Sequence, residues 1–190
     1  MTTPIDLTAT YNRPLILCDI DGTLAAYRHG LIQGINSKFK LNMDVEDMPY
    51  HGQGLVNKKW LKKWHKNEIN ALNLAPCSGA CEGLSKLFDA GFSVTIASLR
   101  NPTLKEVTRL WLTRNNVRYD QLVMNGSQSK LDVILSTEGN IVWFDDLPEN
   151  WQYASQRIHI YCPKQPYTPT DIPDNVTVFD RWDQIIDQLL

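Results

Sequence analysis

The sequence has few features that would place the chain in a membrane or along a duplex. No apolar run approaches the roughly 18 residues that a membrane-spanning helix needs, and the opening MTTPIDLTAT lacks the apolar core of a signal peptide. The formal net charge is only −2, so any contact with nucleic acid must be local. We therefore expect a cytoplasmic protein without a membrane partner.

Cysteine is also scarce. The four cysteines are Cys18, Cys77, Cys81 and Cys162. Cys77 and Cys81 are spaced to lie one helical turn apart, but no second Cys or His pair stands at metal-ligand spacing. Because structural zinc normally has four protein ligands, reduced and mostly buried thiols are the better interpretation.

The 190 residues are 43% hydrophobic and 21% charged, which is typical of a globular protein. Short apolar segments, mostly continuous, predict strands at 15–19, 92–98, 121–124, 141–146 and 157–162, and VTVF at 176–179 adds a last short strand. Amphipathic segments between them predict helices at 79–90, 103–115, 128–137, 149–156 and 180–189. This alternation predicts an α/β fold, a doubly wound parallel sheet with helices on both faces.

Residues 25–74 contain no convincing strand, and we expect them to form a small helical cap inserted into a core of residues 1–24 and 75–190. Within the cap, GLVNKKWLKKWHKNEI has helical periodicity. One stripe of this helix carries Lys58, Lys62 and Lys66, and another carries Trp60 and Trp64. Two interpretations stay open. Either the tryptophans fill the cap core and the lysines are solvated, or the helix faces the cleft and binds a base and a phosphate.

Acidic and polar side chains gather where the predicted strands end. In an open α/β sheet, ligands bind beyond the carboxyl ends of the strands. The residues at these ends are Asp19, Asp21 and Thr23, then Ser98 and Arg100, then Lys130 in a polar loop, and finally Asp145 and Asp146. We expect these side chains to share one cleft.

Four carboxylates in one cleft repel each other unless a cation neutralises them, and oxygen ligands suit Mg²⁺. The candidate metal ligands are Asp19, Asp21, Asp145 and Asp146. A metal ion, a lysine, a hydroxyl and backbone amides form a receptor for a phosphate dianion. The candidate phosphate contacts are Ser98, Lys130, Arg100 and Thr23, although Arg100 could equally be a surface residue. The pattern indicates phosphoryl transfer, with one aspartate as nucleophile and the other moving a proton.

The sequence DIDGT, a strand-end Ser, a loop Lys and FDD resemble the four motifs of the haloacid dehalogenase (HAD) superfamily, over nearly the whole chain outside the insert. The resemblance implies that Asp19 becomes an aspartyl-phosphate. It implies that Asp21 is the general acid and base and that its main-chain carbonyl binds Mg²⁺. It also implies that Ser98 and Lys130 hold the phosphoryl group and that Asp145 and Asp146 complete the metal site. By this resemblance Asp145 is favoured as a direct ligand, and Asp146 binds either directly or through water.

A narrower resemblance concerns ASLRNPTLKEVTRLWLTRNNVRYDQLVM, which is similar to the second-motif region of polynucleotide-kinase-type 3′-phosphatase domains. Leu99 stands where those domains usually have Gly, and Asn125 stands where they often have Arg. The insert resembles the cap of 5′(3′)-deoxyribonucleotidases in length and helical content. These resemblances imply a nucleotide-like substrate.

We therefore predict a Mg²⁺-dependent phosphomonoesterase that acts on a nucleotide or a nucleic-acid-end phosphate. A cap of this size should favour mononucleotides or short single-stranded ends over a duplex. A HAD phosphatase of a sugar phosphate or another small metabolite is the nearest alternative. A HAD-like binding protein without turnover is a second alternative, which would not require both Asp19 and Asp21. The sequence indicates no oligomeric state.

Overall fold

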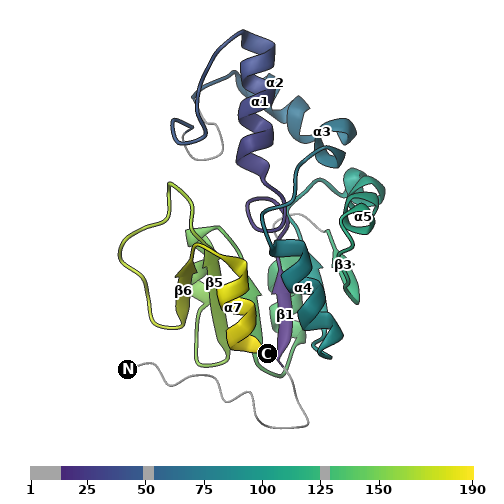
Figure 1. The fold of residues 1–190 in the computed structure, drawn as a ribbon, viewed down its shortest axis with the longest axis vertical. Helices are drawn as coiled ribbons and strands as arrows, with labels where there is room; N and C mark the ends of the chain where they lie inside the picture. Colours follow the sequence, from purple (N-terminus) through teal and green to yellow (C-terminus); the bar gives the residue numbers. More distant parts are fainter. Residues whose placement is uncertain (1–13, 49–53, 125–128) are drawn as a thin grey trace.

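The computed structural model describes residues 14–48, 54–124 and 129–190, and its centre is a six-stranded sheet (Figure 1). The strands are β1 (Leu15–Cys18), β2 (Val94–Ala97), β3 (Gln121–Val123), β4 (Ile141–Phe144), β5 (Ile158–Pro163) and β6 (Val176–Phe179). Every neighbouring pair is parallel, in the order β3-β2-β1-β4-β5-β6. The predicted α/β fold with a parallel sheet is confirmed.

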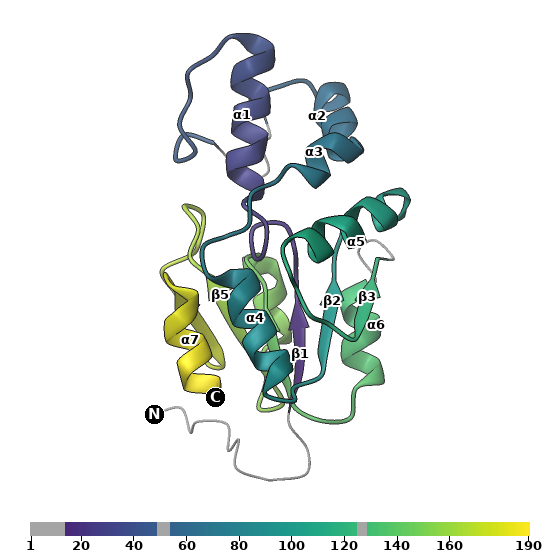
Figure 2. The ribbon, with the colours of Figure 1, turned by 45° about the vertical axis from the view of Figure 1, so that its right-hand side comes forward.

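The sheet is buried on both faces, which explains why its strands are continuous apolar runs (Figure 2). In β1, Ile16 and Cys18 belong to one hydrophobic cluster, whereas Leu17 between them belongs to another. The first cluster includes residues of α4 (Ala80–Asp89), α5 (Lys105–Arg114) and α7 (Trp182–Leu189), and the second includes residues of α6 (Ser129–Ser136). Alternate side chains of β1 therefore pack into hydrophobic clusters on opposite faces of the sheet.

The predicted α-helix over 149–156 is wrong. The chain there forms the 3₁₀-helix η4 (Pro148–Tyr153). The buried carboxylate of Asp145 accepts hydrogen bonds from the Leu147 N–H at 3.0 Å and from the Asn150 side chain at 2.9 Å. These bonds, followed by the proline, turn the chain tightly after β4 and favour the tighter helix. A second 3₁₀-helix, η2 (Pro102–Leu104), precedes α5.

Three helices of the insert lie beyond the carboxyl ends of the strands (Figure 1). They are α1 (Tyr27–Phe39), α2 (Lys58–His65) and α3 (Glu68–Leu72). We propose that residues 25–74 form a cap unit, because they enclose a hydrophobic cluster apart from those of the sheet, with Leu31, Ile35 and Met48 among its buried members. Residues 49–53 of this range lie outside the described part of the chain.

The two tryptophans of α2 pack into the cap. The Trp60 ring makes an edge contact with Phe39, with ring centroids 5.3 Å apart. Trp64 fills space over Gly34 of α1, where an added Cβ would lie 2.5 Å from the indole nitrogen. Among the residues that the structure describes, no helix is both long and apolar enough to cross a membrane.

Candidate active site

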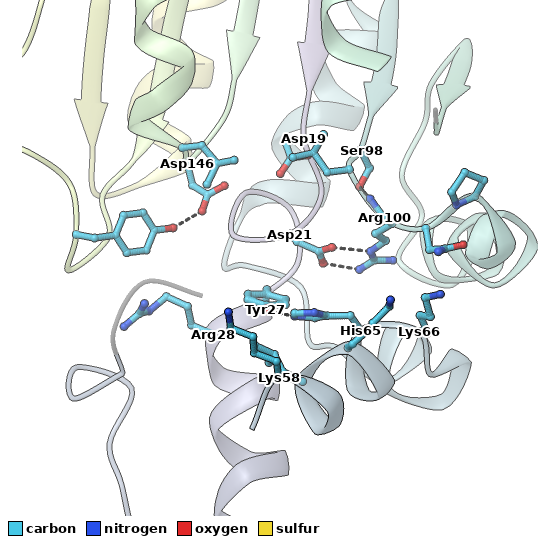
Figure 3. A pocket seen from close by; sticks show the side chains of 17 residues that line it. Asp19, Asp21, Tyr27, Arg28, Lys58, His65, Lys66, Ser98, Arg100 and Asp146 are labelled. Carbon is cyan, nitrogen blue, oxygen red and sulfur yellow. Dashed lines mark hydrogen bonds and ion pairs between the residues drawn. The ribbon is translucent and has the colours of Figure 1, made fainter. Parts of the chain in front are cut away.

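The strand order places the two acidic strand ends side by side. The chain passes from β1 to β2 on one side of β1, and β4 lies on the other side, so the crevice between β1 and β4 is a topological switch point. Asp19 follows β1 and Asp146 lies just beyond β4 at this crevice. A cavity of about 670 Å³ opens here, with the core on one side and the cap on the other (Figure 3).

The turn after β1 is fitted closely to Asp146. Gly22 has φ +91°, and a Cβ at this position would lie 2.1 Å from Asp146 Oδ2. The buried Thr23 hydroxyl donates to Asp146 Oδ1 at 3.4 Å, and Thr23 is not among the residues that line the cavity. Thr23, predicted as a phosphate contact, therefore holds an acidic side chain in place. The glycine of DIDGT leaves room for that carboxylate.

Lys130 is buried between two carboxylates. Its Nζ lies 3.0 Å from Asp19 Oδ1 and 2.6 Å from Asp145 Oδ2, and all three residues are buried. A lysine in this position fixes the orientation of both acids and neutralises part of their charge. It does not line the cavity, so it acts on Asp19 from behind.

The two acids after β4 have different surroundings. The oxygens of Asp145 accept from Lys130, from the Trp143 indole at 3.0 Å, and from Leu147 and Asn150. Asp146 lines the cavity, where the Tyr167 hydroxyl donates to it. The geometry favours Asp146 over the expected Asp145 as the direct metal ligand, because Asp146 lines the cavity and Asp145 does not.

Arg100 pairs with Asp21 through two parallel hydrogen bonds. Nε lies 2.8 Å from Asp21 Oδ2 and Nη2 lies 2.7 Å from Oδ1, while Nη1 donates to Thr108 at 3.3 Å. Arg100 is buried, so the surface alternative is excluded. It lines the cavity, and its Nε and Nη2 donate to Asp21. The buried Ser98 lines the cavity beside it, and its hydroxyl accepts from the Arg100 N–H at 3.3 Å.

The floor of the cavity has the charge and the donors that suit a hard divalent cation. Burial raises the pKa of Asp19 to about 7; Lys130 opposes this rise, while Asp145 and Asp21 add to it. Burial also raises the pKa of Asp146, and the charges of Asp19 and Asp145 raise it further. Lys130 alone therefore does not offset the cost of ionising Asp19 and Asp146, and a divalent cation would lower that cost.

The described residues include no group of three His, Cys, Asp or Glu side chains that could hold a metal ion. Two of the four acids are already paired within the protein: Asp145 with Lys130, and Asp21 with Arg100. Asp19 and Asp146 both line the cavity, and carboxylate oxygens are ligands that suit Mg²⁺. The residues present fit Mg²⁺.

The cap contributes its lysines to the cavity and keeps its tryptophans away from it. Lys58, Lys62 and Lys66 line the cavity, whereas Trp60 and Trp64 do not. The prediction that one of these tryptophans faces the cleft is wrong for this cavity. The reason is packing: both indoles bury their large apolar area in the hydrophobic cluster of the cap, against α1. Trp64 reaches a smaller neighbouring pocket that also contacts Asp21.

Several lining residues were missed by the sequence reasoning. They are Tyr27, Arg28 and Tyr167, and the last lies in the loop between β5 and β6. His65 of the cap also lines the cavity. The Tyr27 hydroxyl and His65 Nε2 share a hydrogen bond of 2.5 Å (Figure 3). No spacing in the sequence connects these residues with the acidic motifs. Asn125, which departs from the phosphatase pattern, lies outside the described residues.

Comparison with known proteins supports the fold. No family model matches the chain. A protein of Bacillus subtilis (strain 168) named "Putative nucleotidase YqfW" is 22% identical over 169 residues, which are 86% of this chain and 87% of that protein. A haloacid dehalogenase-like hydrolase of Streptococcus pneumoniae has a TM-score of 0.64 at 10% identity, over 93% of this chain and 98% of the other.

The D,D-heptose 1,7-bisphosphate phosphatase of B. bronchiseptica, solved with magnesium and phosphate, has a TM-score of 0.55 at 12% identity. The alignment covers 93% of this chain and 97% of the other. The sheet order, the acidic strand ends and these likenesses lead to one assignment. The chain has the fold of the haloacid dehalogenase superfamily of hydrolases.

Proposed function

We propose that the protein is a Mg²⁺-dependent phosphomonoesterase that acts through an aspartyl-phosphate on Asp19. One observation carries the proposal. The carboxylates of Asp19 and Asp146 face one cavity from adjacent strand ends, with Lys130 buried behind Asp19 and Ser98 beside it. Phosphoryl transfer depends mainly on positioning and on charge neutralisation, and this floor offers both.

The steps divide between the two aspartates of the β1 turn. An oxygen of Asp19 attacks the phosphorus, the bond to the leaving oxygen breaks, and Asp21 gives that oxygen its proton. Asp21 then takes a proton from the water that attacks the aspartyl-phosphate, which releases phosphate and restores Asp19. Arg100 orients the Asp21 side chain in the turn through two hydrogen bonds, from Nε and Nη2.

Asp19, Asp146 and the main-chain carbonyl of Asp21 would hold the metal ion. Bound there, Mg²⁺ would neutralise the charge that builds up on the phosphoryl oxygens. Lys130 keeps Asp19 oriented, and Tyr167 and Thr23 keep Asp146 oriented.

A nucleotide is the first candidate substrate. The name of the Bacillus subtilis relative supports it, and so do the aromatic rings of Tyr27, His65 and Tyr167 in the cavity wall, on which a base could stack. A sugar phosphate is the second candidate, because a heptose bisphosphate phosphatase shares the fold.

The test is hydrolysis of p-nitrophenyl phosphate with Mg²⁺ and with excess EDTA. We expect turnover with Mg²⁺ and a loss of at least about 100-fold in EDTA, recovered when Mg²⁺ is added back. Nucleoside 5′- and 3′-monophosphates, a 3′-phosphorylated oligonucleotide and sugar phosphates then rank the substrate classes. Full activity in EDTA would contradict the metal requirement, and no turnover of any phosphomonoester would contradict the proposal.

Asp21→Asn should distinguish leaving groups. An alkyl phosphate needs a proton on its leaving oxygen, so we expect kcat to fall by about 10²- to 10⁴-fold for a nucleoside monophosphate. For p-nitrophenyl phosphate, whose leaving group is stable without a proton, the loss in the first step should be much smaller. Single-turnover measurements of the two substrates separate that step from the later hydrolysis. Equal losses for both would remove Asp21 from the role of general acid.

A further inference from the structure

The wall of the cavity opposite the acidic floor is basic. Arg28 of α1, Lys58 of α2 and Lys66 at the C-cap of α2 lie across the cavity from Asp19 and Asp146 (Figure 3). Lys62 of α2 also lines the cavity. The proposed mechanism uses the floor and Asp21, and it assigns nothing to the four cations of the cap. Their position across the cavity from the reacting phosphate separates them from the proposed chemistry.

Arg28 is the most informative of these cations, because it is buried and incompletely paired. Only 5% of the residue is exposed. Its Nη2 donates to the carbonyl oxygens of Val45 at 2.6 Å and Met48 at 2.7 Å, and its guanidinium lies 5.3 Å from the centroid of the Tyr167 ring. Within the described part of the chain, Nε and Nη1 are buried without a hydrogen-bond partner. Unsatisfied donors on a buried charge are costly, so a ligand that accepts from them would offset that cost.

The lysines of α2 carry an independent signal. Lys58 and Lys62 of α2 and Lys66 at its C-cap follow one another at four-residue spacing, so their positive charges repel along one side of the helix. Helix α2 contains no acidic residue, and within the described residues none of the three forms an ion pair. Lys59 and Lys63, on the same helix, do not line the cavity. Within the described residues, no acidic side chain neutralises the positive charges of these three lysines.

We propose that this wall, formed by Arg28, Lys58 and Lys62 and extended by Lys66, binds a second phosphate of the substrate. The inference rests on the proposed function: the floor takes the phosphate that is cleaved, and the wall takes one that is retained. A cavity of about 670 Å³ is large enough for a small molecule with phosphates at both ends. The substrate class is therefore a bisphosphorylated small molecule.

The experiment compares matched pairs of substrates. Adenosine 3′,5′-bisphosphate is compared with adenosine 5′- and 3′-monophosphates, and fructose 1,6-bisphosphate with fructose 6-phosphate, so that nucleotide and sugar sources are separated. We expect kcat/KM for the better bisphosphate to exceed that of its monophosphate by at least about tenfold, mostly through KM. The double variant Lys58→Ala/Lys62→Ala should reduce that ratio to below about threefold.

The double variant Lys59→Ala/Lys63→Ala is the matched control, since it removes the same charge from the same helix outside the cavity. It should keep the wild-type ratio. Equal ratios for mono- and bisphosphates in both pairs, or equal losses in the two double variants, would overturn the inference. The proposed function is judged separately by hydrolysis of p-nitrophenyl phosphate.

Calorimetry decides the inference even where turnover is low. With Asp19→Asn and Mg²⁺ present, adenosine 3′,5′-bisphosphate or fructose 1,6-bisphosphate should bind at least about tenfold more tightly than its monophosphate. Removal of Lys58 and Lys62 in this background should abolish the difference. Indistinguishable affinities for the two members of each pair would refute a second phosphate site, whatever the protein hydrolyses.

Discussion

Asp19→Asn should lower kcat for p-nitrophenyl phosphate by at least about 10³-fold, because an amide oxygen is a poor nucleophile and a poor ligand for Mg²⁺. The fold should survive. The variant removes a buried carboxylate whose pKa burial has raised to about 7, and Lys130 keeps its contact of 2.6 Å with Asp145. Thermal unfolding without metal should therefore show no loss of stability at pH 8.

The sign of that stability effect follows from the raised pKa. In the metal-free protein, ionisation of Asp19 costs stability as the pH rises through about 7, and an asparagine has no such cost. Asp187→Asn, an exposed acid on α7, is the control and should change neither activity nor stability. If Asp19→Asn kept more than a few per cent of the wild-type kcat, the covalent mechanism would be wrong.

Lys130→Met should be the most destabilising substitution of the site. It removes a cation that lies 3.0 Å from Asp19 Oδ1 and 2.6 Å from Asp145 Oδ2, and Asp145 is completely buried. Breaking a buried ion pair costs about 3–5 kcal/mol, since the remaining charge loses its partner. We expect a loss of this size in the free energy of unfolding, measured in denaturant, together with loss of turnover.

Lys164→Met is the matched control for Lys130. Lys164 forms a pair with Asp180 at 3.6 Å, but both side chains are more than half exposed. Such surface pairs contribute at most about 1 kcal/mol, so this variant should unfold almost as the wild type does. A Lys130→Met protein as stable as Lys164→Met would show that Lys130 is solvated rather than buried between the acids.

The architecture of the sheet could be read from the sequence because it depends on local and repetitive signals. Strands buried on both faces are nearly continuous apolar runs. β1 and β4 are apolar throughout, and β2 departs from this only at the buried Thr95. The helices between the strands are recognised by apolar residues that recur at helical spacing. The one failure at this level, η4, came from the side chain of Asp145, whose hydrogen bonds to Leu147 and Asn150 no periodicity reveals.

The gathering of the acids was likewise predictable, because parallel strands end at one edge. Which of these acids faces the cavity could not be predicted from the sequence. Asp145 and Asp146 are adjacent in sequence, yet one faces Lys130 and Trp143 while the other faces the cavity. Adjacent residues beyond a strand end can turn to opposite sides, and only the packing around them shows which oxygens remain open.

The sequence by itself determined the α/β class, the position of the acidic strand ends and the helical nature of the insert. Tertiary structure decided which side of the cap helix faces the cavity: Gly34 and Phe39 of α1 accept the tryptophans, and the lysine stripe is left toward the floor. It also placed Arg28 and Tyr167 together from distant segments. The physical reason is that periodicity reports the neighbours along one helix or strand, whereas the substrate surface is made by contacts between elements far apart in the chain.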